Sequence, residues 1–175
     1  MTPPHVLIQA DARAVDPITV SAPRTAWRLL GQFGVLLAVI GWIDIALHWY
    51  PLVSGSPEWE FGTIAATFAG LPLPTMGVIA ALAAAMARAV KVNVTVLTVV
   101  QGLIVLFLAG CMIVFLLDIP LALRAVAAPG VPVQAVTEMK RTIVRALVMG
   151  VGFGAVYLYG TIVSTRFLLR RVKDA

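Results

Sequence analysis

The chain has 175 residues, of which 61% are hydrophobic and only 12% are charged, whereas a soluble globular domain is about half apolar and a quarter charged. Its mean hydropathy is +0.98, and the apolar residues form runs long enough to cross a bilayer, which takes about 20 helical residues each. The net charge of +5 does not indicate nucleic-acid binding, because the basic residues stand at the ends of these runs, where they set orientation. We therefore expect an all-α integral membrane protein, a four-helix bundle.

The first predicted element is a polar N-terminal tail over residues 1–27. It contains four prolines before residue 24 and lacks the apolar core of a cleavable signal peptide. A tail of this kind frays unless something holds it, so we expect a partner subunit to order it. The first span is predicted over about residues 28–47. Small residues mark one narrow face of it for close helix packing, namely Gly31, Gly34, Ala38 and Gly41.

An aromatic segment without Lys or Arg ends the first span and leads into the loop after it. Tryptophan and tyrosine concentrate where the bilayer meets water, because their rings are apolar and their edges carry a polar group. We expect four residues to be anchors of this kind, namely Trp42, Trp49, Tyr50 and Trp59. The alternative is that these rings stack on a lipid, quinone or pigment.

A short amphipathic helix is predicted over about residues 57–69. Ser56 can cap it, Pro57 suits its first turn, and Glu58 favours the positive end of its dipole. Its apolar face is expected to comprise Phe61, Ile64, Ala65 and Phe68, and its polar face Glu60, Thr63 and Thr67. Two such faces are typical of a helix that lies in the membrane interface rather than one that crosses the membrane.

Pro72 and Pro74 end the short helix, because a residue before proline is pushed away from helical angles. The alternative is a kink within one longer helix. The remaining predicted elements are a second span at about residues 74–89, a third at about 94–117, a fourth at about 143–165 and a basic tail over 166–175. The single cysteine, Cys111, lies within the third span and is interpreted as a small buried apolar residue.

The distribution of Lys and Arg predicts the orientation. Nine of them fall in the N-terminal tail and its junction, the turn between the second and third spans, and the C-terminus, whereas four fall between the third and fourth spans. Positive residues favour the cytoplasmic side, so we expect both termini in the cytoplasm.

The connection between the third and fourth spans carries positive charge on the expected outer side. Its helical character continues past Leu117, and residues 129–132 form a predicted turn, so the two helices should project as an antiparallel hairpin. This register would place Arg124 near Glu138, and Asp118 near Arg141 and Arg145. Exposed pairs of this kind contribute little to stability.

A polar cluster is predicted near the outer surface from Asp44, His48, Asp118 and Arg145. Asp44 and His48 are neighbours on one helical face, and an ionisable residue at membrane depth is a functional candidate. The simpler interpretation is a network that fixes helix register, and the alternative is a proton or ion site. His48 is a weak candidate for cofactor binding, but one nearby histidine is too few for a bis-histidine haem, and we expect no metal site.

Glycines in the fourth span have a structural interpretation. Gly150 and Gly154 form the Gly-x-x-x-Gly pattern of close helix packing rather than a nucleotide loop, and Gln101 is expected to hydrogen-bond between helices. The sequence contains no nucleophile triad, metalloprotease helix or phosphate loop. We therefore expect a protein that is not an enzyme.

The stretch Pro57-Glu58-Trp59-Glu60-Phe61-Gly62, followed by Leu71-Pro72-Leu73-Pro74, resembles a segment of small, uncharacterised four-span bacterial membrane proteins. The resemblance covers about residues 41–77 and implies architecture, with no activity to transfer. The function that we expect is a non-catalytic accessory subunit of a larger membrane complex, respiratory or photosynthetic, in contact with other subunits and with lipids. The alternatives are a small transporter or channel built on the polar cluster and a cofactor-binding redox protein.

Overall fold

The computed structural model describes residues 24–53 and 55–173, and over these residues its regular secondary structure is entirely helical. The helices are α1 (Arg24–His48), α2 (Pro57–Gly70), α3 (Pro72–Ala87), α4 (Lys91–Val126) and α5 (Val133–Lys173). The all-α class is thus confirmed for the described part of the chain. The expected ordering of the N-terminal tail concerns residues 1–23, which lie outside the described residues.

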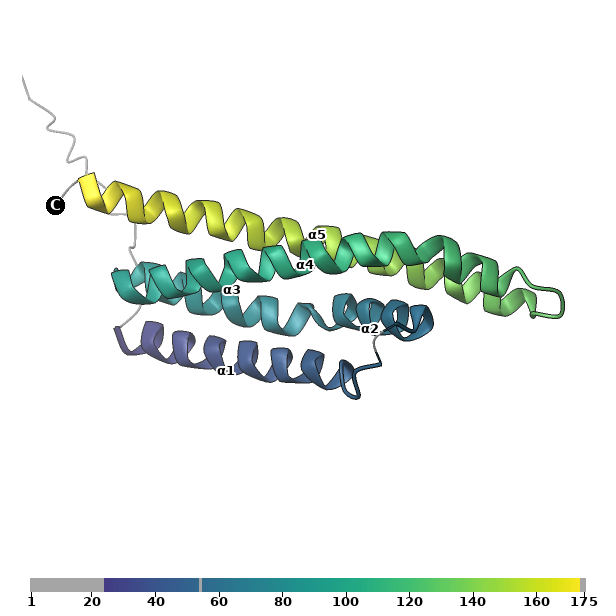
Figure 1. Ribbon diagram of the computed structural model, residues 1–175. Helices are drawn as coiled ribbons and strands as arrows, with labels where there is room; N and C mark the ends of the chain where they lie inside the picture. The colour runs from purple at the N-terminus through teal and green to yellow at the C-terminus, as the bar shows by residue number, and fades with distance from the viewer. Residues whose placement is uncertain (1–23, 54, 174–175) are drawn as a thin grey trace, which may run out of the picture.

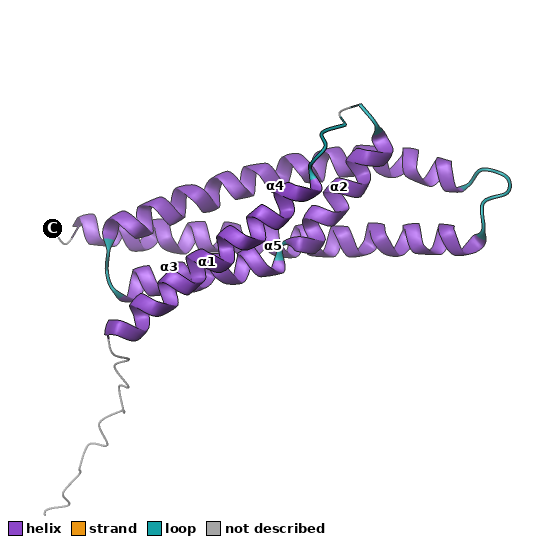
Figure 2. Cartoon of the chain, turned by 90° about the horizontal axis from the view of Figure 1, so that it is seen from below, coloured by secondary structure: helices purple, strands orange, loops and turns teal. Residues whose placement is uncertain are grey.

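The helices form an elongated bundle in which the chain runs up and down along one long axis (Figures 1 and 2). The start of α1, the α3–α4 turn at residues 88–90 and the end of α5 lie together, and we call this the terminal end. The connections over residues 49–56 and 127–132 lie toward the other end, which we call the loop end (Figure 1). The most extensive helix pairs are α1 with α3 and α4 with α5.

Three helices, α1, α4 and α5, are each long and apolar enough to cross a membrane. Helices α2 and α3 pass the same test together, which gives up to four spans if this bent pair counts as one. Large apolar side chains stay exposed along the long helices, for example Leu29, Phe33, Leu47, Leu103, Leu106 and Val148. Monomeric soluble proteins rarely expose contiguous apolar surface on this scale, and these features are those of a membrane protein.

Glycines allow α1 and α3 to approach until their backbones touch. A Cβ atom built on Gly34 would lie 2.6 Å from the Ala81 nitrogen, and one built on Gly41 would lie 2.5 Å from Pro74 Cδ. Gly77 on α3 faces the same contact, where an added Cβ would lie 2.5 Å from the Gly34 carbonyl oxygen. Side chains larger than hydrogen at these positions would push the two helices apart.

Helix α2 begins at Pro57, directly after the capping residue Ser56, as the sequence predicts. Ser56 has extended backbone angles, and its hydroxyl accepts a hydrogen bond from the Trp59 amide at 3.4 Å. The expected polar face, however, was wrong. Thr63 and Thr67 are buried together with Phe61 and Phe68, because α2 packs against α1, α4 and α5 rather than exposing one side. The hydroxyl of Thr67 donates to the Thr63 carbonyl at 2.9 Å, which satisfies its donor inside the bundle.

Helices α2 and α3 are separated by Leu71 alone and are bent by 43°. The break has a chemical cause, because Pro72 and Pro74 have no amide hydrogen to donate to the carbonyls of the preceding turn. The expected push of the residue before proline away from helical angles was wrong, since Leu71 keeps φ of −58° and ψ of −29°. The sequence allowed either a break between two helices or a kink within one longer helix. The geometry lies between the two, because the helix is interrupted but continues with a bend of only 43°. It is the geometry of a broken span or a re-entrant loop.

Helices α4 and α5 form the expected antiparallel hairpin and project beyond α2 at the loop end (Figure 1). They have 36 and 41 residues, about 54 and 62 Å at 1.5 Å per residue, which exceeds the roughly 30 Å of a hydrocarbon core. Gly130, with φ of +92°, makes the turn. The expected ion pair between Arg124 and Glu138 is not formed. Glu138 instead pairs with Arg141, one turn along the same helix, at 3.3 Å.

Candidate functional site

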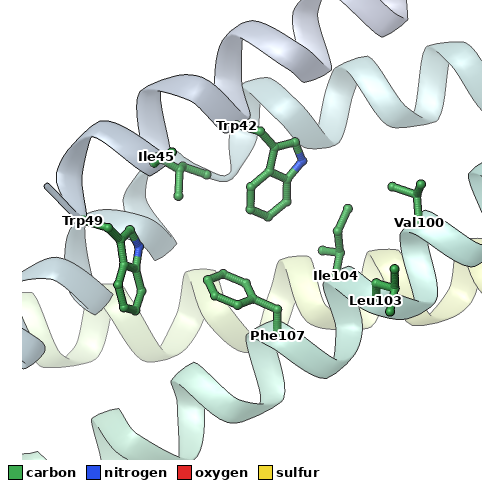
Figure 3. A pocket seen from close by; sticks show the side chains of 8 residues that line it. Trp42, Ile45, Trp49, Val100, Leu103, Ile104 and Phe107 are labelled. Atoms are coloured by element: carbon green, nitrogen blue, oxygen red, sulfur yellow. The ribbon is translucent and has the colours of Figure 1, made fainter. Parts of the chain in front are cut away.

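The main candidate site is an apolar groove between α1 and α4. No Cα atom of α1 lies within 8 Å of a Cα atom of α4 in the described chain, because α1 packs on α3 instead. The gap between α1 and α4 is a hollow of about 520 Å³. Figure 3 shows the side chains that face it, which include Trp42 and Ile45 from α1, Trp49 directly after α1, and Leu103, Ile104 and Phe107 from α4. We call it the α1–α4 groove.

Three aromatic rings shape the α1–α4 groove. Phe107 lies between the two tryptophans, with ring centroids 6.2 Å from Trp42 and 6.0 Å from Trp49. Trp49 is fixed from behind, since its Nε1 donates a 3.0 Å hydrogen bond to Thr67 Oγ1 and its ring meets Trp59 edge to face at 5.9 Å. Trp42, Trp49 and Trp59 therefore take part in packing as well as standing near the loop end, whereas Tyr50 is 81% exposed.

The chemistry that the α1–α4 groove can perform is narrow. None of its lining residues titrates in the ordinary pH range, so it offers no general acid or base. Its one polar group of note is Trp42 Nε1, which is buried and has no hydrogen-bond partner in the described part of the protein. An indole nitrogen can only donate. The groove therefore suits an apolar ring, chain or side chain.

Asp44 and His48 lie near the loop end of α1, and both are exposed. They are neighbours, as the sequence predicts, but the contact involves the backbone. His48 Nδ1 donates a 2.8 Å hydrogen bond to the main-chain carbonyl of Asp44 rather than to its carboxylate. This bond holds the imidazole against the last turns of α1.

The structure separates the other two members of the predicted polar cluster. Asp118 on α4 is buried, with 8% of its surface exposed, and its Oδ2 atom has no hydrogen-bond partner among the described residues. Its electrostatic neighbour is Glu60 of α2, which the sequence placed on a solvent face. Arg145 is exposed on α5 and lines a surface hollow with Lys140 and Arg141. Ile143 and Ala146 face the bundle instead, so Arg145 points away from Asp118.

Replacement of Asp118 by asparagine is expected to raise the free energy of unfolding by about 1 kcal/mol, because a buried charge without a partner costs more than a neutral amide in the same place. The change keeps the shape, removes a buried charge and ends the repulsion with Glu60. Unfolding of the detergent-solubilised protein at pH 8 measures it. Asp44→Asn is the matched control, because Asp44 is exposed, and it should change stability by no more than about 0.5 kcal/mol. A loss of stability in Asp118→Asn would contradict this account.

The predicted packing glycines occupy different environments. Gly31 faces Ala84 of α3, and a Cβ built on Gly150 would lie 2.5 Å from Met112 Cε. No atom lies within 4 Å of the corresponding position at Gly154. Gly160, which the sequence interpretation passed over, is the glycine that faces Gln101, and an added Cβ there would lie 2.7 Å from the Gln101 Oε1 atom.

The core between α3, α4 and α5 contains polar contacts that the sequence interpretation missed. Thr75 donates a 3.2 Å hydrogen bond to the Tyr157 hydroxyl across 82 positions of the chain. Gln101 is 2% exposed, and its Oε1 has no partner in the described part of the protein. Gln101 was identified because it is a lone polar residue in an apolar run, whereas Tyr157 lacked such a signal because tyrosine is common at membrane interfaces.

The fold and groove define a helical membrane protein with an apolar hollow between α1 and α4. No group of three or more His, Cys, Asp or Glu residues comes together as a metal site within the described ranges. Comparison with known protein families, curated proteins and solved structures gives no match. The arguments for function therefore rest on the chain's own residues.

Proposed function

We propose that the chain is a non-catalytic accessory subunit of a larger membrane complex, which it stabilises through helix packing. The observation that carries the proposal is the α1–α4 groove. Trp42 and Phe107 lie at an open side gap between α1 and α4 instead of being enclosed by the bundle's own helices. The groove supplies shape and apolar surface rather than reactive groups, which suits packing against another subunit.

The arrangement of polar residues also favours this function over a transporter. A proton or ion path requires several polar side chains that face a common channel. Asp44, His48 and Arg145 are exposed, and Asp118 is buried beside Glu60. The polar contacts within the bundle, such as Thr75 with Tyr157, join side chains directly. We interpret them as fixing helix register.

The proposed setting is a bacterial cytoplasmic membrane crossed four times, with both termini in the cytoplasm. In this arrangement α2 and α3 together form one broken span, and the terminal end faces the cytoplasm. Nine of the chain's 13 Lys and Arg residues fall in the sequence segments expected on the cytoplasmic side, which are the N-terminal tail and its junction, the turn between the second and third spans, and the C-terminus, and this supports the orientation. The resemblance of residues 57–62 and 71–74 to small four-span bacterial proteins supports the bacterial setting. A respiratory or photosynthetic assembly is the proposed home.

The test compares two positions of similar depth and exposure. Leu103 on α4 faces the groove and is 61% exposed, whereas Leu158 on α5 is 50% exposed and does not line it. The two lie at about the same level, because Gln101 faces Gly160 in the antiparallel pair. A photo-crosslinking residue at position 103 should capture another membrane protein in native membranes, and the same residue at position 158 should capture far less of it.

Native gels after mild solubilisation provide the second measurement. The proposal predicts a species much larger than the protomer, from which the captured protein is recovered. A monodisperse protomer or small homo-oligomer, with only lipid captured from position 103, would refute it. A bound chromophore in the visible spectrum, lost in Trp42→Ala, would instead assign the groove to a pigment-binding or redox protein.

A further inference from the structure

A second hollow lies at the terminal end, on the opposite half of the molecule from Asp44, His48 and Asp118. It is enclosed by α1, α3 and the start of α4 and has a volume of about 510 Å³. Its origin is the small side chains of α3, since Ala81, Ala84 and Ala85 leave space beside Gly31 that larger residues would fill. We call it the arginine hollow, because Arg28 and Arg88 stand at its rim.

The charge of the arginine hollow is not neutralised by the described protein. Arg28 and Arg88 are exposed, and neither forms an ion pair or side-chain hydrogen bond with any described residue. Both also line an adjoining hollow of about 480 Å³, together with Arg24 and Trp27. The described acids belong to the opposite half of the bundle, namely Asp44, Glu58, Glu60, Asp118 and Glu138. Two guanidinium groups that share a cavity without a counter-ion favour an anion.

The side chains that line the arginine hollow change from amide groups near the arginines to aliphatic groups farther away. Gln32 and Asn93 carry amide groups close to the arginines along the sequence, and Val35, Val96 and Leu97 continue the wall with aliphatic surface. Amides can donate to ester carbonyls, and the aliphatic surface suits acyl chains. A phosphate, a pair of esters and hydrocarbon chains are joined in this order in a phospholipid, and the volume lies within the range of small-molecule sites.

We infer that the arginine hollow binds one anionic phospholipid, with its phosphate between Arg28 and Arg88 and its chains along Val35 and Leu97. The described residues favour an anionic lipid over a zwitterionic one, because six basic side chains gather at this end: Arg24, Arg28, Arg88, Lys91, Arg166 and Arg170. The N-terminal segment is a less concentrated source of negative charge, since residues 1–23 contain two Asp and one Arg, whereas a phospholipid carries its charge on one phosphate. This lipid binding does not depend on the proposed function.

Native mass spectrometry of the full chain, titrated with phosphatidylglycerol in mild detergent, tests the assignment. Arg28→Gln with Arg88→Gln should weaken binding about 25-fold, because each basic residue near an anionic lipid contributes about five-fold. Lys140→Gln with Arg145→Gln removes the same charge at exposed positions of α5 and should leave binding within about two-fold. Gln32→Glu, an isosteric change, should also weaken binding, and it keeps the test available if the double arginine variant fails to fold.

Three further arms separate the sources of the anion. Phosphatidylcholine with the same chains should bind much more weakly, and inorganic phosphate should not displace phosphatidylglycerol. Equal retention of both lipids, displacement by inorganic phosphate, or wild-type binding by the double arginine variant would overturn the assignment. A photo-crosslinking residue at position 32 that captured residues 1–23 would overturn it in favour of the N-terminal segment.

Discussion

Replacement of Gly77 by leucine is expected to detach α1 from α3 and to lower the free energy of unfolding by at least about 3 kcal/mol. Position 77 has no room for a side chain, because an added Cβ would lie 2.5 Å from the Gly34 carbonyl oxygen and closer still to the Ala38 nitrogen. These are backbone atoms, which cannot rotate away as a side chain would. Relief requires the two helices to separate, and α1 loses its most extensive contact.

The matched control for this change is Gly110→Leu. Gly110 is an exposed glycine within α4, and no atom lies within 4 Å of the position that its Cβ would occupy. Leucine should therefore be tolerated there and gain about 0.5 to 1 kcal/mol of helix propensity. Denaturant titration in mixed micelles measures both variants. Equal stability of Gly77→Leu and wild type would show that the backbone contact between α1 and α3 does not form.

Replacement of Phe115 by alanine is expected to cost about 3 to 5 kcal/mol. Phe115 is fully buried, and its ring stacks on Phe61 with centroids 4.8 Å apart and meets Phe68 edge to face at 5.9 Å. Both partners belong to α2, so this ring holds the short helix against α4. Removal of the ring leaves a cavity between α2 and α4. In a lipid environment the loss of van der Waals packing is the main contribution to the lost stability, because lipid tails are as apolar as the protein interior.

Leu116→Ala controls for the loss of a large apolar side chain on the same turn of α4. Leu116 is 50% exposed, so its truncation should change the free energy of unfolding by no more than about 0.5 kcal/mol. Phe115→Leu should lie between alanine and wild type. Similar losses in Phe115→Ala and Leu116→Ala would contradict a specific role for the aromatic cluster. The measurement is again unfolding in mixed micelles.

Much of the fold could be predicted because apolar runs and helix breakers are local signals. The start of α2 at Pro57, the break before Pro72 and the turn at Gly130 each follow from residues within a few positions of one another. Gly34 and Gly41 were identified as packing residues from their shared helical face. Gly77, which completes their contact, carried no comparable signal because the alanines that follow it in α3 are spread widely around the helix and mark no single narrow face.

The errors arose where a distant element decides the environment of a residue. Thr67 was expected to face water because its neighbours along α2 suggest two faces, yet the indole of Trp49 donates to its hydroxyl. Asp118 was expected beside arginines of α5, but the packing of α2 brings Glu60 to it. Amphipathic periodicity reports the polarity of one helix and carries no information about the groups that a neighbouring helix presents.

The candidate site was predictable only in part. Trp42 and Trp49 were identified from composition, and stacking on an apolar ring was one of the alternatives. The α1–α4 groove exists because α1 packs against α3 and not against α4. Its two walls come from residues 42–49 and 100–107. Pairing between such distant segments is a property of the whole bundle, which one sequence does not report.

The pairing of α1 with α3 and of α4 with α5 has a consequence for how the chain comes together during synthesis. Each strong contact is made within one half of the sequence, divided at the turn over residues 88–90. The first half can therefore complete its own packing before the second has left the ribosome, because local contacts form early. The protein then consists of two separately packed halves that associate late, through contacts of α2 and α3 with α4 and α5. The α1–α4 groove is the part of the boundary between the two halves where helices do not come into contact.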